Sequence, residues 1–94
     1  MKATIYTEVK SQEEWSLNKK DVEKLIKYLK SEQSWDDTFK DFDSQIEIIW
    51  ELENNPDKYA NEIRSWLYNN LHEPYKEWCG EEGNVFDFYS YKKD

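Results

Sequence analysis

Residues 32–53 constrain this chain more than any other stretch, because they combine a strong negative charge with a repeating apolar pattern. The stretch contains eight acidic residues and one lysine, which supply −7 of the chain's −8. On a helix turning about 100° per residue, six apolar side chains share roughly 100° of arc, and six carboxylates fill most of the opposite side. The pattern therefore predicts an amphipathic helix. Its apolar set is Trp35, Phe39, Phe42, Ile46, Ile49 and Trp50, and its acidic set is Asp36, Asp37, Asp41, Asp43, Glu47 and Glu51.

Capping residues suggest where this acidic helix begins and ends. Ser34 is a candidate N-cap, and the two acids in the following turn suit the positive end of a helix dipole. The helix either continues to Asn54 or breaks near residues 43–44, where a second cap is possible. Ile48 and Leu52 fall on or beside the acidic face of a continuous helix. They either pack against another helix or act as apolar anchors of an interface.

Two more helices are predicted by their first residues. Asn18 is a typical N-cap, with Asp21 in the first turn, and the apolar stripe that follows is Val22, Leu25, Ile26 and Leu29. Pro56 suits the first position of a helix, because its missing N–H would have no partner there. The apolar side of that helix is formed by Tyr59, Ile63, Trp66, Leu67 and Leu71.

The two ends of the chain show the period of two expected of strands, over residues 3–9 and 85–91. Residues 10–15 are expected to be a polar connection, and residues 75–79 one short helical turn after Pro74. Because an isolated strand pair is marginal, the terminal strands should pair with each other on a helical layer. The predicted fold is one small α+β domain over residues 1–94, with N- and C-terminal strands paired antiparallel against three main helices.

Composition excludes several kinds of chemistry. The chain has one histidine, His72, and one cysteine, Cys79, so it lacks the ligand pairs of structural zinc sites and cannot form an internal disulfide. With two glycines it has no phosphate loop or nucleophile elbow. The stretch beginning at Asp41 lacks the glycine and glutamate of a calcium loop. We therefore expect no cofactor, no metal and no enzymatic activity, although an acid/base carboxylate pair could not be located by sequence alone.

Charge and hydropathy also bear on partners. A net charge of −8, with a single arginine, Arg64, opposes direct binding to nucleic acid. No apolar run is long enough for a signal peptide or a membrane span. The sequence predicts a soluble protein located in the cytoplasm.

The acidic face supports one binding hypothesis. Six carboxylates along about 22 Å of continuous helix would approach the charge spacing of a DNA strand. Such a row could occupy the basic groove of a nucleic-acid-binding protein. The expected function is a small acidic inhibitor of a host defence enzyme, such as a CRISPR effector or a restriction enzyme, of the kind that phages carry. Its site residues would be Asp36, Asp37, Asp41, Asp43, Glu47 and Glu51.

Two other interpretations account for the same residues. The acidic face would only keep a small domain in solution, or the chain would be an adaptor that binds proteins through an aromatic surface. The aromatic candidates are Tyr75, Trp78, Tyr89 and Tyr91. Salt distinguishes binding through the acidic face from binding through the aromatic surface, because screening weakens a charged interface more than an aromatic one.

Overall fold

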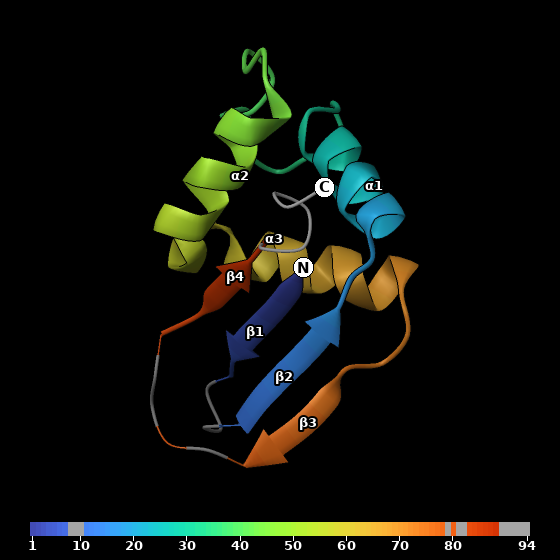
Figure 1. The fold of residues 1–94 in the computed structure, drawn as a ribbon, viewed down its shortest axis with the longest axis vertical. Coiled ribbons are helices and arrows are strands. Elements are labelled where there is room, and N and C mark those ends of the chain that lie inside the picture. The colour runs from blue at the N-terminus through green and yellow to red at the C-terminus, as the bar shows by residue number, and fades with distance from the viewer. Residues whose placement is uncertain (8–10, 79, 81–82, 89–94) are drawn as a thin grey trace.

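Four strands and three helices form the part of the chain that the computed structural model describes, residues 1–7, 11–78, 80 and 83–88 (Figure 1). The strands lie towards one end of the long axis and α1 and α2 at the other, with α3 crossing between them (Figure 1). The elements are β1 (Lys2–Tyr6), β2 (Ser11–Ser16), α1 (Lys19–Leu29), α2 (Gln45–Asn54), α3 (Pro56–Asn70), β3 (Tyr75–Trp78) and β4 (Val85–Asp87). The predicted α+β class is confirmed.

The strands form one antiparallel sheet in the order β3-β2-β1-β4. β1 pairs with β4, and Ala3 lies opposite Phe86, so the predicted pairing of the chain's two ends is confirmed. The predicted strands also included residues 8–9 and 89–91, which lie outside the described residues.

β2 was predicted to be a polar connection, and that prediction is wrong. Its burial alternates: Glu13 and Trp15 are buried between less buried neighbours. Trp15 packs edge-on against Tyr68 of α3 and donates its indole N–H to the carbonyl of His72 at 3.0 Å. Because the inward-facing residue Glu13 is charged, this strand lacks the alternation of apolar residues from which a strand is predicted.

β3 is likewise a strand where a helical turn was predicted. Residues 75–78 pair antiparallel with β2, from Tyr75 opposite Glu14 to Trp78 opposite Ser11. Pro74 is buried immediately before the strand. Proline restricts its own φ but fits a strand start as well as a helix start, so the sequence alone did not distinguish them.

The helices α1 and α3 begin where the sequence predicted. Asn18 and Asp21 form a capping box at the start of α1, each side chain accepting from the other residue's backbone N–H at 2.9 and 3.2 Å. Pro56 opens α3, which ends at Asn70. Their apolar faces meet the sheet in one core that includes Leu25, Ile63, Leu67, Phe86 and Phe88.

The acidic segment is not one helix. Residues 31–44 form turns, and α2 begins only at Gln45 after the N-cap Ser44, whose hydroxyl accepts from Ile46 N–H at 3.1 Å. A helix boundary is thus present near residues 43–44, but residues 32–43 of the acidic segment form turns and no helix. Ser34 is not a helix cap: its hydroxyl donates to Glu62 of α3 at 2.5 Å. Side-chain bonds of this kind compete with helical hydrogen bonding.

Candidate functional site

The structure divides the six predicted site carboxylates into two groups. Three of them are bonded to other residues of the molecule. Asp36 accepts from Thr38 N–H at 2.8 Å and from the Thr38 hydroxyl, and these bonds lower the pKa of Asp36. Asp37 pairs with Lys40 at 2.6 Å. Glu51 accepts from the Tyr59 hydroxyl at 2.9 Å.

The remaining three carboxylates are Asp41, Asp43 and Glu47. All three are exposed, and none makes a hydrogen bond or ion pair with any residue that the structure describes. They follow one another along the last loop residues and the first turn of α2. The six carboxylates therefore do not form the single helical row that the sequence predicted, and these three are the ones without a bonded partner among the described residues.

The apolar face predicted for the acidic segment is partly wrong as well. Phe39 and Ile49 are buried, but Trp35, Ile46 and Trp50 are exposed. Ile48 and Leu52, by contrast, are fully buried, which confirms that they pack inside the molecule. The helix begins ten residues later than predicted. It packs on α3 and β4 through the face that carries Ile48, Ile49 and Leu52, which differs from the predicted apolar face.

The outer side of α2 consequently carries an apolar stripe. Ile46 and Trp50 are 69% and 60% exposed and stand four residues apart, so their side chains are neighbours on the helix surface. Glu47 lies three residues before Trp50 and borders the same stripe. We call the set Asp41, Asp43, Ile46, Glu47 and Trp50 the acidic–aromatic surface.

Two buried carboxylates that the sequence analysis did not identify have structural roles. Glu62 accepts from Ser34 Oγ at 2.5 Å and from Trp35 N–H at 3.0 Å. Glu13 pairs with Arg64 at 2.5 Å and accepts from the Tyr68 hydroxyl. Burial pushes the pKa of Glu13 upward, but hydrogen bonds from Arg64 and Tyr68 outweigh burial and leave that pKa below its ordinary value. Both carboxylates therefore already accept hydrogen bonds from other residues of the protein.

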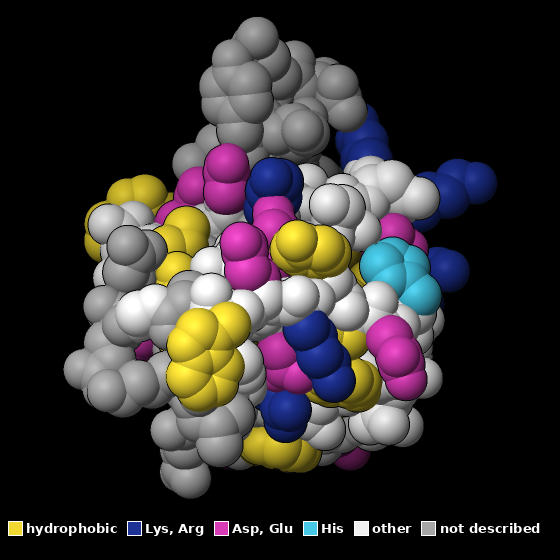
Figure 2. Space-filling view, turned by 90° about the horizontal axis from the view of Figure 1, so that it is seen from below, with side chains coloured by type: hydrophobic (Ala, Val, Ile, Leu, Met, Phe, Trp, Pro, Cys, Tyr) yellow, Lys and Arg dark blue, Asp and Glu magenta, His cyan; other side chains and the backbone are white. Residues whose placement is uncertain are grey.

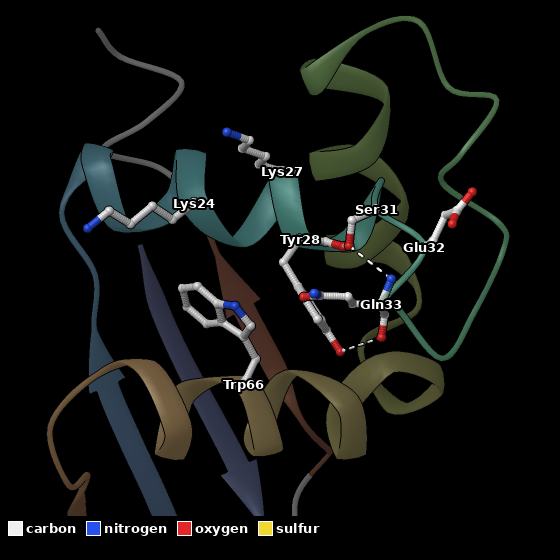
Figure 3. A pocket seen from close by; sticks show the side chains of 7 residues that line it. All are labelled: Lys24, Lys27, Tyr28, Ser31, Glu32, Gln33 and Trp66. Carbon is white, nitrogen blue, oxygen red and sulfur yellow. Dashed lines mark hydrogen bonds between the residues drawn. The ribbon is translucent and has the colours of Figure 1, made fainter.

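A hollow of about 550 Å³ lies between α1 and α3 (Figure 3). The rings of Tyr28 and Trp66 form its aromatic part, with centroids 6.4 Å apart and planes tilted by 35°. Lys24 and Lys27 of α1 also line the hollow, and their ammonium groups point away from the two rings (Figure 3). Its full lining is Lys24, Lys27, Tyr28, Ser31, Glu32, Gln33 and Trp66.

A second hollow, of about 600 Å³, lies beside exposed Trp35 on the outside of α3. Its lining is Trp35, Asn61, Arg64, Ser65, Tyr68 and Asn69. Arg64 is already committed to Glu13 and lies over the Tyr68 ring at 4.9 Å, so this hollow offers amide and hydroxyl groups without a free charge.

The edge strand β3 carries two exposed aromatic side chains, Tyr75 and Trp78. They are three residues apart, so they point to opposite faces of the sheet. Figure 2 views the molecule from this end and shows hydrophobic, acidic and basic side chains interspersed. The other predicted aromatic site residues, Tyr89 and Tyr91, and Cys79 lie outside the described residues.

Within the described ranges, no group of three or more His, Cys, Asp or Glu side chains could hold a metal ion. His72 lies just beyond the end of α3, and its Nδ1 is 2.8 Å from the carbonyl oxygen of Glu73. The helices of the described residues are too short or too polar to cross a membrane.

Comparison with known proteins yields one family. A family model described as the TcaA protein second domain matches residues 6–78. No curated protein and no solved structure matches the chain. The matched range includes both α2 and the hollow between α1 and α3.

Proposed function

This chain belongs to the TcaA second-domain family, and from that premise we propose that it is a non-catalytic protein-binding module. The family is named for one domain of a TcaA protein, which fits a modular role. The bound partner is a protein that presents lysine or arginine side chains, and it contacts the acidic–aromatic surface on the outer side of α2.

The exposure of Trp50 beside unpaired carboxylates carries this proposal. Trp50 is 60% exposed, although the helix that carries it buries Ile48, Ile49 and Leu52 completely. Covering an aromatic side chain can remove about 150–250 Å² from water, and tryptophan is enriched among the residues that dominate interface energies. Asp43 and Glu47 supply negative charge at the rim of the same stripe, which favours lysine and arginine on the partner.

A capture experiment with paired variants tests the proposal. The domain is immobilised, proteins retained from a cell lysate are quantified, and wild type is compared with an Ile46→Ser/Trp50→Ser variant. The proposal predicts that the double variant loses at least one captured protein, and that salt elutes this protein from wild type. A matched Trp78→Ser variant, changed at a still more exposed indole on β3, should retain it. Equal retention by all three proteins would contradict the proposal.

Capture that depends on Trp78 and not on Trp50 would favour a different surface. Trp78 is 77% exposed and Tyr75 64%, and both belong to the edge strand of the sheet. An adaptor that binds through these aromatic side chains should keep its partner at high salt. The same experiment therefore separates the two protein-binding surfaces.

A narrower candidate is an acidic inhibitor of a nucleic-acid-binding enzyme in the cytoplasm of a host cell. Asp41, Asp43 and Glu47 favour it, because they are exposed and make no bond within the described residues. In this candidate the three carboxylates compete with phosphates for a basic groove. Its test is competition: the domain should displace DNA from the captured partner, and an Asp41→Asn/Asp43→Asn/Glu47→Gln variant should do so at least about tenfold less well.

A further inference from the structure

We propose that the acidic–aromatic surface binds a second copy of this chain, with Trp50 inserted into the hollow between α1 and α3 of that copy. This inference rests on the proposed function, because it names the partner for the same surface. It requires a receptor of suitable shape and opposite charge, and the chain itself contains one.

The hollow offers an aromatic seat for an indole ring. Trp66 is buried, with 7% exposed, and Tyr28 is half-buried, so Tyr28 presents the larger surface to the hollow that both residues line. Their planes are tilted by 35°. A third ring can pack against such a pair edge-on or offset, the arrangements that aromatic groups prefer. A volume of about 550 Å³ leaves room for one large side chain.

Charge complementarity supports the same pairing. Lys24 and Lys27 stand at the rim of the hollow, and neither makes a hydrogen bond or ion pair with the residues that the structure describes. Glu32 also lines the hollow, but its carboxylate points away from the ring pair (Figure 3). With Trp50 seated, Asp43 and Glu47 of one copy come near the two ammonium groups of the other.

α1 and α2 lie at the same end of the molecule (Figure 1). In the proposed dimer, a two-fold axis at this end relates the two copies, so that α2 of each copy contacts α1 of the other. Each Trp50 then fills the hollow of the opposite copy, which closes the assembly as a dimer and prevents a growing chain.

Sedimentation equilibrium tests the proposal on the purified chain. Wild type should form a dimer as its concentration rises to about 1 mM. Trp50→Ala should weaken the dimer at least about tenfold, because it removes the inserted ring. Trp78→Ala, at an indole on the far end of the molecule, should leave it unchanged. A wild-type chain that stays monomeric, or a dimer that is indifferent to Trp50→Ala, would overturn the inference.

Charge reversal gives a second test that does not depend on the loss of packing. Lys24→Glu/Lys27→Glu in one chain and Asp43→Lys/Glu47→Lys in another should each abolish self-association, because like charges then meet. Mixing the two variants restores opposite charges at both contacts of the pair. A mixed dimer of near wild-type affinity is expected, and its absence would contradict the proposed pairing.

The two proposals fail in different ways. If the wild-type chain stays monomeric but Ile46→Ser/Trp50→Ser still loses a captured protein, the second copy is wrong as the partner and the binding module stands. If neither self-association nor capture depends on Trp50, both proposals fail.

Discussion

The two faces of α2 contain the same kinds of residue in opposite environments. Ile48, Ile49 and Leu52 are fully buried on the inner face, whereas Ile46 and Trp50 are largely exposed on the outer face. The inner face is explained by packing against α3 and β4. The outer face contributes little to that core, so its apolar side chains call for another explanation, and a partner supplies one.

The same contrast separates the carboxylates. Glu13 and Glu62 are buried and accept hydrogen bonds from protein groups, whereas Asp43 and Glu47 are exposed and accept none from the described residues. A buried carboxylate must be satisfied for the domain to fold. An exposed one is already satisfied by water. The difference predicts which substitutions affect folding and which affect binding.

The largest effect is expected on the inner face. Leu52→Ala should lower the free energy of unfolding by about 2–5 kcal/mol, since it leaves a cavity in the core. Urea unfolding, followed by far-UV circular dichroism, measures this change. A loss below about 1 kcal/mol would mean that α2 packs less tightly than its burial indicates.

A smaller loss is expected when a buried carboxylate loses its partner. Arg64→Met should lower the free energy of unfolding by about 1–3 kcal/mol, because the Glu13 carboxylate stays buried without its cation. Lys40→Met, which unpairs the exposed Asp37, is the matched control and should cause no measurable change.

The Glu13 pair also predicts a pH dependence. The lowered pKa of Glu13 stabilises the fold above the carboxyl's ordinary pKa of 4.5, and this contribution is lost as the pH falls through the lowered value. Between about pH 5 and pH 2, wild type should therefore lose more stability than Arg64→Met. Parallel curves would contradict the role assigned to the pair.

The start of α2 should show an intermediate effect. Ser44→Ala removes the side-chain acceptor of Ile46 N–H and should cost about 1 kcal/mol, whereas Ser44→Asp should restore most of the loss. Thermal unfolding of the two variants measures the difference. Equal stability of Ser44→Ala and wild type would indicate that the boundary between loop and helix is set by packing alone.

The smallest effect on folding is expected on the outer face. Trp50→Ala should change the free energy of unfolding by no more than about 0.5 kcal/mol. Ile46→Ala serves as its companion on the same stripe. A loss similar to that of Leu52→Ala would show that the outer face belongs to the core and would remove the basis of the binding proposal.

The sequence correctly predicted the helices and strands whose positions are set by residues within or next to them. Asn18 and Pro56 marked two helix starts, and the alternation around Phe86 marked the C-terminal strand. β2 was missed because its inward Glu13 is made tolerable by Arg64, which lies 51 residues away in sequence. No pattern within the strand itself reveals that pairing.

The continuous helix predicted for the acidic segment was wrong for a related reason. Its apolar spacing is helical, but the loop is held by tertiary bonds that periodicity does not contain. Ser34 and the Trp35 N–H bond to Glu62 of α3, and Lys30 Nζ donates to the carbonyl of Phe42 at 2.7 Å. These contacts hold residues 31–44 in turns, so the predicted carboxylates do not share one helix face and Trp50 is exposed.

The most direct test of the central claim is amide hydrogen exchange of the whole chain at low and at high protein concentration. If two copies pair through the outer face of α2, protection rises with concentration over residues 43–50 and along α1 near the hollow, while β3 is unchanged. Exchange at residues 43–50 that does not depend on concentration, or protection confined to β3, would contradict the assignment of the outer face of α2 as the binding surface for a second copy.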